Sequence, residues 1–192
     1  MTTVLEFAEK WRTLIELLSF IAAIFAAVIL AFEVYRTKRV LDKDAKWRRR
    51  SQTFQLYTSE RLEITEKHRI IRDHFGIKLG DIISEKQARE LSNSPELKSA
   101  ARFVLGKLER LAAGIELEVY DYDVVFKTTR NNILGIYGVY ESYIKYTRSR
   151  QPNVYNSLEI LVERLALESE LRGLHLAHGY VSYLNRTDDA EL

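Results

Sequence analysis

Residues 14–50 read LIELLSFIAAIFAAVILAFEVYRTKRVLDKDAKWRRR, an apolar run followed directly by a basic one. From Leu17 to Phe32 only Ser19 is polar. A helix over residues 14–32 would be about 28 Å long at ~1.5 Å per residue, close to the hydrocarbon thickness of a bilayer. Trp11 and Tyr35 flank the run, as aromatic side chains do at membrane interfaces. The stretch predicts a transmembrane helix over residues 13–35.

Two alternatives compete with a membrane span. A buried core helix of a soluble protein is also apolar, and a cleaved signal peptide also lies at the N-terminus. A signal peptide normally begins with a positively charged region. Residues 1–12, in contrast, carry Glu6 and Glu9 beside Lys10 and Arg12. The apolar run is also long, and a strong basic stop follows it, so we favour a span that stays in the mature protein.

A basic segment over residues 36–50 follows the span and carries eight cationic side chains against Asp42 and Asp44. Residues 1–12 carry only two. The positive-inside rule therefore places residues 1–12 outside and the chain from residue 36 onward in the cytoplasm. The basic segment either only sets this topology or also contacts anionic membrane lipid. The predicted membrane-interface residues are Trp11, Tyr35, Arg36, Lys38, Arg39, Arg48, Arg49 and Arg50.

Small residues recur at every fourth position inside the span, at Ser19, Ala23, Ala27 and Ala31. Such a stripe lets two membrane helices approach closely. It predicts helix association and hence a homo-oligomer. Chance is the competing explanation, because alanine is common in membrane helices.

The rest of the chain is predicted to be all-α, with a cytoplasmic helical bundle over residues 51–185 and a polar tail over residues 186–192. No Gly or Pro precedes Gly76, so one helix can continue out of the membrane. A seven-residue repeat along this helix either packs on the domain or forms a coiled coil with a second chain. Arg61 and His68 interrupt its apolar stripe, which holds Phe54, Tyr57, Ile64, Ile71 and Phe75.

Capping signals predict the later helices. Ser84 with Gln87 forms a capping box, and Ser94 followed by Pro95 opens a helix that runs to about Gly114. Further helical segments are expected after a cap at Asp121 or Asp123, over residues 133–146, and from Leu158 to Val181 after the turn at residues 151–153.

The sequence lacks the motifs of common enzymes and cofactor sites. It contains no cysteine, which excludes disulfides, thiolate metal sites and cysteine nucleophiles. It also contains no phosphate-binding glycine loop and no H-E-x-x-H pair. None of the four histidines, His68, His74, His175 and His178, follows a glutamate by three residues. We therefore expect a non-enzymatic protein without metal or cofactor.

The distribution of charge along the chain also indicates whether nucleic acid is a partner. Residues 51–192 carry 19 basic against 21 acidic side chains, so the domain beyond the basic segment is slightly acidic. A nucleic-acid-binding domain usually spreads its basic footprint over its own fold. Nucleic acid is therefore an unlikely partner.

Tyrosines recur at every third position at Tyr137, Tyr140, Tyr143 and Tyr146, with cationic side chains nearby. Aromatics mixed with cations bind protein partners or stack bases, and they also occur in half-buried amphipathic packing. All three interpretations stay open at this point. The candidate partner-binding residues are Tyr137, Tyr140, Tyr143 and Arg148.

Two stretches of the chain are distinctive, VLGKLERLAAGIELEVYDYDVVF at residues 104–126 and ESYIKYTRSRQPNVYNSLEILVERL at residues 141–165. Through them, about a third of the chain resembles the bacterial domain of unknown function 4760 family. The resemblance implies an N-terminal membrane helix, but no reaction. The matching positions are Leu108, Leu111, Gly114, Asp121, Tyr143, Ile144, Arg148 and Tyr155.

These observations together predict a single-pass protein of the bacterial inner membrane, with its N-terminus outside and an all-α domain in the cytoplasm. The expected function is a non-enzymatic interaction or scaffold module with an unidentified protein partner. The alternative is a membrane effector of a phage-defence or toxin system that acts by oligomerising in the membrane.

Overall fold

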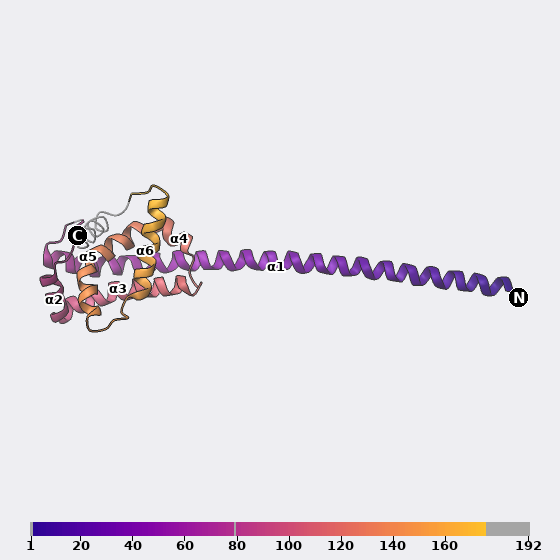
Figure 1. The fold of residues 1–192 in the computed structure, drawn as a ribbon, viewed down its shortest axis with the longest axis horizontal. Coiled ribbons are helices and arrows are strands. Elements are labelled where there is room, and N and C mark those ends of the chain that lie inside the picture. The colour runs from indigo at the N-terminus through magenta and orange to yellow at the C-terminus, as the bar shows by residue number, and fades with distance from the viewer. Residues whose placement is uncertain (1, 79, 176–192) are drawn as a thin grey trace, which may run out of the picture. The chain divides into compact units, whose positions relative to one another are not determined.

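The computed structural model describes residues 2–78 and 80–175, and over these residues the chain contains six helices and no strand (Figure 1). The all-α prediction is confirmed. The helices are α1 (Thr2–Phe75), α2 (Glu85–Asn93), α3 (Pro95–Glu116), α4 (Tyr122–Thr128), α5 (Arg130–Arg148) and α6 (Asn156–Leu171).

The chain divides into two compact units, residues 1–48 and residues 49–192, and α1 contributes residues to both. The first unit contains the apolar run. Over the described residues, α1 is the one helix long and apolar enough to cross a membrane, and none of its apolar window is buried. Phe20, Phe25 and Leu30 each expose about two thirds of their surface. This is the surface that a membrane-spanning helix presents to lipid.

The absence of Gly and Pro before residue 76 explains the length of α1, and Gly76 explains its end. Gly76 has a φ of 64°, a left-handed conformation that ends helices and that glycine adopts without strain. The amide of Ile77 then donates to the carbonyl of Arg72 at 2.9 Å. This closes the last turn of the helix.

The capping predictions are confirmed. The Ser84 side chain accepts from the Gln87 amide, and the Gln87 side chain accepts in return from the Ser84 amide. Ser94 caps α3 with Pro95 in its first turn, and Asp121 caps α4 by accepting from the Val124 amide at 3.1 Å. Each cap satisfies amides that a helix start leaves without a partner inside the helix.

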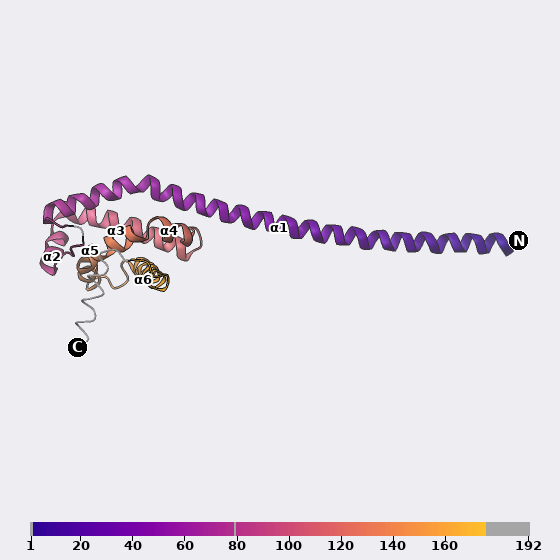
Figure 2. The ribbon, with the colours of Figure 1, turned by 90° about the horizontal axis from the view of Figure 1, so that it is seen from above.

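The core of the second unit forms between α3, α5 and α6. Figure 2 shows α2 to α6 gathered on one side of the C-terminal part of α1. Helix α3 packs on α2 and α6, and α5 packs on α2, α4 and α6. From α1, Ile64 and Ile71 enter the core, with 4% and 0% of their surface exposed. The repeat in α1 therefore packs on its own domain.

The structure corrects one end of that repeat. Phe54, expected to begin the core stripe, is 56% exposed, and Thr53 is buried instead. The Thr53 hydroxyl accepts from the Asp121 amide at 2.8 Å and donates to the Arg49 carbonyl at 2.7 Å. A buried polar contact thus joins α1 to the start of α4 at this position.

The last helix is shorter than predicted. Helix α6 ends at Leu171, and Gly173 adopts a φ of 62°. The Leu174 amide donates to the Ser169 carbonyl at 2.9 Å, which completes a glycine-terminated helix end. Leu174 therefore lies outside the helix. Val181 and the expected polar tail over residues 186–192 lie outside the described residues.

Candidate functional site

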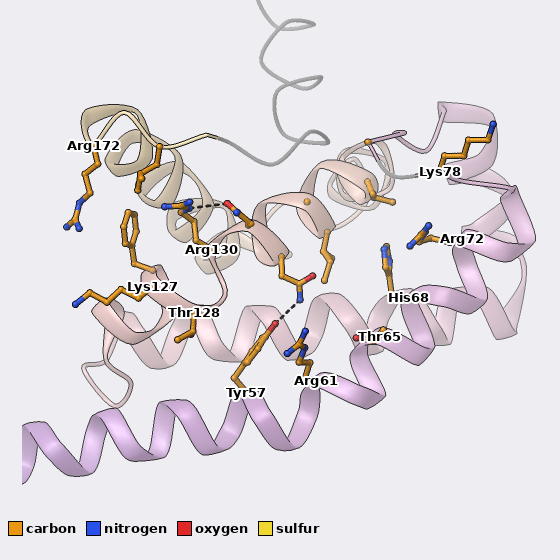
Figure 3. A pocket seen from close by; sticks show the side chains of 18 residues that line it. Tyr57, Arg61, Thr65, His68, Arg72, Lys78, Lys127, Thr128, Arg130 and Arg172 are labelled. Carbon is orange, nitrogen blue, oxygen red and sulfur yellow. Dashed lines mark hydrogen bonds between the residues drawn. The ribbon is translucent and has the colours of Figure 1, made fainter.

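The second unit contains a cavity of about 830 Å³ between the C-terminal part of α1, the α4–α5 region and the residues after α6 (Figure 3). Six of its lining residues are cationic: Arg61, Arg72, Lys78, Lys127, Arg130 and Arg172. Among the described residues that line it, none is aspartate or glutamate. We call this feature the basic cleft.

The cations are grouped along the cleft. Figure 3 shows Arg72 and Lys78 with His68 at one end, and Lys127 and Arg172 at the other. Arg61 lies between the two groups, on α1. Within residues 2–78 and 80–175, Arg61, Lys78 and Lys127 have exposed side chains and make no ion pair. Their charge is available to an anion from solution.

At the end of the cleft that holds Lys127 and Arg172, two arginines are held against one aromatic ring. The guanidinium carbons of Arg130 and Arg172 lie 5.2 and 4.6 Å from the centre of the Phe126 ring. Arg130 also donates to the Asn131 side chain at 3.1 Å, and Arg172 pairs with Glu168. These contacts hold both guanidinium groups at the Phe126 ring, and the Glu168 carboxylate offsets part of the charge of Arg172.

At the opposite end, beside His68 and Lys78, Arg72 is oriented by the chain beyond α1. Its Nε atom donates to the carbonyl of Ile77 at 3.3 Å, so the glycine turn at Gly76 positions both the arginine and the neighbouring Lys78. Across the middle of the cleft, the Asn132 amide group donates to the Tyr57 hydroxyl at 2.8 Å (Figure 3). This bond joins α1 to α5 and fixes the width of the cleft there.

His68 is neutral at pH 7. Burial lowers its pKa to about 4, and the neighbouring Arg72 guanidinium lowers it in the same direction. Its Nδ1 atom lies 3.1 Å from the hydroxyl of Tyr140. The cleft therefore combines permanent cations with neutral hydrogen-bonding groups, an arrangement suited to holding an anion.

The predicted tyrosine surface does not exist as expected. Tyr137, Tyr140 and Tyr143 expose 4%, 0% and 1% of their surface, because α5 is buried on nearly all sides. Burial raises the pKa of both Tyr140 and Tyr143. These rings are core, which corrects their assignment as partner-binding residues.

Arg148, the fourth residue of that set, has a structural role. It donates to the carbonyls of Val154 and Tyr155 at 2.9 and 3.0 Å and to the Glu159 carboxylate at 2.7 Å. Tyr155 precedes α6 in a left-handed conformation and offers no side-chain cap. Glu109 of α3 caps α6 instead, accepting from the amides of Ser157 and Leu158. Arg148 thus holds the turn between α5 and α6.

The predicted membrane-interface residues fall into two groups. In the first unit, Trp11, Tyr35, Arg36, Lys38, Arg39 and Arg48 are exposed. In the second unit, Arg50 pairs with Asp121 at 3.1 Å and Asp123 at 3.4 Å, and Arg49 pairs with Glu118 at 3.6 Å. Arg49 and Arg50 therefore contact the helical domain, while their side chains stay 40% and 41% exposed.

The small-residue stripe of Ser19, Ala23, Ala27 and Ala31 is exposed along the first unit. Its one hydroxyl is satisfied locally, because Ser19 donates to the Glu16 carbonyl at 2.8 Å. The stripe therefore presents small side chains, and its hydroxyl already has a hydrogen-bond partner within the helix. This is compatible with close approach of a second helix.

The basic cleft has no local signature in the sequence. Its cations are spread from residue 61 to residue 172, with no local motif. One signal was present: Arg61 and His68 interrupt the apolar repeat of α1, and both line the cleft. The two interruptions mark turns of α1 that line the cleft.

The fold and the cleft define a class: over the described residues, an all-helical protein with one candidate membrane span and a basic cleft in its folded domain. The sequence model of one family, described as "Domain of unknown function (DUF4760)", matches residues 13–165. The chain belongs to this family. Comparisons with curated proteins and with solved structures found no match.

Proposed function

We propose that this protein is a membrane-anchored, non-enzymatic binding module whose helical domain faces the cytoplasm and holds an anion in the basic cleft. The observation that carries the proposal is the convergence of six cationic side chains on one cavity with no carboxylate among its described lining residues. Like charges gathered around one cavity repel, and a bound anion offsets that repulsion.

The membrane anchor is supported by the exposed apolar surface of α1 in the first unit. An apolar surface of this extent is costly in water and favourable in lipid. The basic residues after it, from Arg36 to Arg48, support a cytoplasmic position of the domain by the positive-inside rule.

The chemistry of the cleft supports binding over catalysis. Its arginine and lysine side chains are hydrogen-bond donors and offer no acceptor. His68, with a pKa of about 4, is a weak base. Such a set orients and neutralises an anion but supplies no strong general base from the described lining residues.

A second candidate function is a membrane effector of a defence or toxin system. The exposed stripe of Ser19, Ala23, Ala27 and Ala31 favours it, because self-association in the bilayer is what such an effector needs. The two candidates are compatible if the cleft senses an anion and the span responds.

Two measurements test the proposal. A reporter fused after Leu192 is expected to be active only in the cytoplasm, and a periplasmic signal would contradict the orientation. Full-length protein in detergent is expected to gain thermal stability from millimolar orthophosphate at constant ionic strength, because a ligand of the native state stabilises it. The same gain in a variant with both Arg61→Ala and Lys127→Ala would contradict anion binding in the cleft.

A further inference from the structure

The chain leaves α6 at the wall of the basic cleft. Gly173 follows the last turn of the helix with a φ of 62°, and the next residue, Leu174, lines the cleft together with Arg172. Arg172 belongs to the end of the cleft that also holds Lys127 (Figure 3). Any charged group carried by the chain beyond residue 175 is therefore tethered beside the cations of the cleft.

The sequence beyond residue 175 contains an acidic stretch, which we define as residues 188–191. It reads DDAE, so Asp188, Asp189 and Glu191 place three carboxylates within four positions. Of the six cations that line the cleft, only Arg172 makes an ion pair within residues 2–78 and 80–175. The acidic stretch thus carries the type of charge that is absent from the described lining of the cleft.

The tether is long enough to bring the acidic stretch to any of these cations. Leu174 and Asp188 are 14 positions apart, which is roughly 46 Å for a fully extended chain. Arg61 and Arg72 are 11 positions apart on α1, or about 16 Å along the helix. A binding group on a short linker acts at an effective concentration on the order of millimolar. A free anion has to exceed this advantage.

The tether, and not the chemistry of the cations, favours this occupant. Guanidinium and ammonium groups pair with carboxylates and phosphates alike. Three carboxylates within four positions extend over about 10 Å at ~3.3 Å per residue. They can therefore compensate neighbouring cations and need not bridge both ends of the cleft.

We propose that the acidic stretch occupies the basic cleft of its own chain and is a tethered competitor of the anion that the cleft holds. This inference rests on the proposed function, because it names an occupant of the same cleft. An added anion has to displace the acidic stretch. The cleft therefore responds only to anions that are abundant or that bind tightly.

The first test is calorimetric titration of full-length protein in detergent with tripolyphosphate at constant ionic strength. A triple variant, Asp188→Asn with Asp189→Asn and Glu191→Gln, removes the three charges of the acidic stretch. It should bind tripolyphosphate at least about threefold tighter than the wild type, because the tethered competitor is lost. The matched control removes three exposed carboxylates outside the cleft: Glu63→Gln, Glu66→Gln and Glu163→Gln. The control should bind tripolyphosphate like the wild type.

The second test traps the contact by a disulfide in the full-length chain, which contains no cysteine of its own. Ala190→Cys within the acidic stretch is combined with Thr65→Cys or Thr128→Cys, two positions that line the cleft. The control partner is Ser99→Cys, which is exposed on α3 outside the cleft. Under mild oxidation, we expect at least one cleft position to form the disulfide about tenfold faster than the control, because the contact raises the local concentration.

The trapped contact should also depend on charge. In a background with Arg61→Ala and Lys127→Ala, two exposed cations of the cleft are removed, and the cleft positions should form the disulfide no faster than the control position. A preference for the cleft that persists in this background would show that charge does not hold the acidic stretch there, and would contradict the inference.

The inference requires both results, and the failure of either one overturns it. Equal tripolyphosphate affinity of the wild type and the triple variant would leave an anion cleft without a tethered competitor. A cleft disulfide that joins two chains would assign the acidic stretch of a second copy to the cleft, which also overturns the inference. Absence of tripolyphosphate binding in the wild type and the triple variant alike would contradict the proposed function itself.

Discussion

The Nδ1 atom of His68 lies 3.1 Å from the hydroxyl oxygen of Tyr140, and the two rings are 5.5 Å apart. His68 lines the basic cleft, whereas Tyr140 is fully buried in α5. The contact therefore joins the wall of the cleft to the core of the domain. Protonation of His68 would therefore place a charge beside a core residue.

We expect the stability of the domain to fall as the pH drops from 6.5 to 4. The pKa of His68 is lowered from 6.5 to about 4 by burial and by Arg72. In this window the unfolded chain takes up a proton that native His68 does not, so protons favour unfolding. The loss due to His68 is about 3 kcal/mol at most, and chemical denaturation at a series of pH values measures it.

The control is His68→Gln, which keeps a polar group facing Tyr140 but cannot titrate. Carboxylates titrate in the same range in both proteins and cancel in the difference. The free energy of unfolding of the variant should depend less on pH between 6.5 and 4. Identical slopes for the two proteins would show that native His68 titrates normally.

Arg148→Ala is expected to lower the free energy of unfolding by about 2–3 kcal/mol, because three hydrogen bonds of a charged group are lost. Arg148→Lys should recover less than half, since an ammonium cannot reach two carbonyls and a carboxylate in the geometry of the guanidinium. Arg150→Ala is the neighbouring control. Arg150 is exposed and lies over the half-buried ring of Tyr146, and its loss should cost no more than about 0.5 kcal/mol.

Two glycines of α3 make a matched pair. A methyl group added at Gly114 would lie 2.2 Å from the Tyr120 ring, whereas one added at Gly106 meets nothing within 4 Å. Gly114→Ala should destabilise the domain by about 1–3 kcal/mol. Gly106→Ala should stabilise it by about 0.5–1 kcal/mol, because alanine loses less entropy in a helix. Urea unfolding checks both, and equal effects would show that Tyr120 moves aside without cost.

Ala23→Leu and Ala27→Leu keep the first unit apolar but replace two small residues of the exposed stripe. If a second helix packs there, self-association in a membrane two-hybrid assay should weaken by about 1–2 kcal/mol. Ala22→Leu and Ala26→Leu, one position away on the helix, are the controls. A protein that stays monomeric in cross-linking, with all four variants unchanged, would remove the homo-oligomer and the effector that depends on it.

Local signals in the sequence predict local structure here. Ser94 before Pro95 predicts the start of α3, and the absence of Gly and Pro before Gly76 predicts the long α1, because caps and breakers act within a few residues. The spacing of the tyrosines was less informative. Periodicity shows which residues share one face of a helix. It does not show how many faces of that helix other helices cover, and α5 is buried on nearly all sides.

The basic cleft illustrates the limit of sequence reasoning. Arg61 and Arg172 are 111 positions apart, and only the packing of α1 and α6 around α4 and α5 places both on one cavity. Conversely, Arg49 and Arg50 continue a basic run in sequence, yet the fold pairs them with Glu118 and Asp121. Clusters of charge in the sequence and in space are different here, because tertiary contacts select which charges remain available.

The central claim, that the basic cleft binds an anion, is tested most directly at His68. Full-length protein labelled with ¹⁵N-histidine is titrated by NMR with and without tripolyphosphate at constant ionic strength, and His74 serves as an internal reference outside the cleft. A bound anion should raise the pKa of His68 from about 4 toward its ordinary value of 6.5, because it offsets the positive field of Arg72. An unchanged pKa of His68 at saturating tripolyphosphate, or an equal shift at His74, would contradict an anion in the cleft.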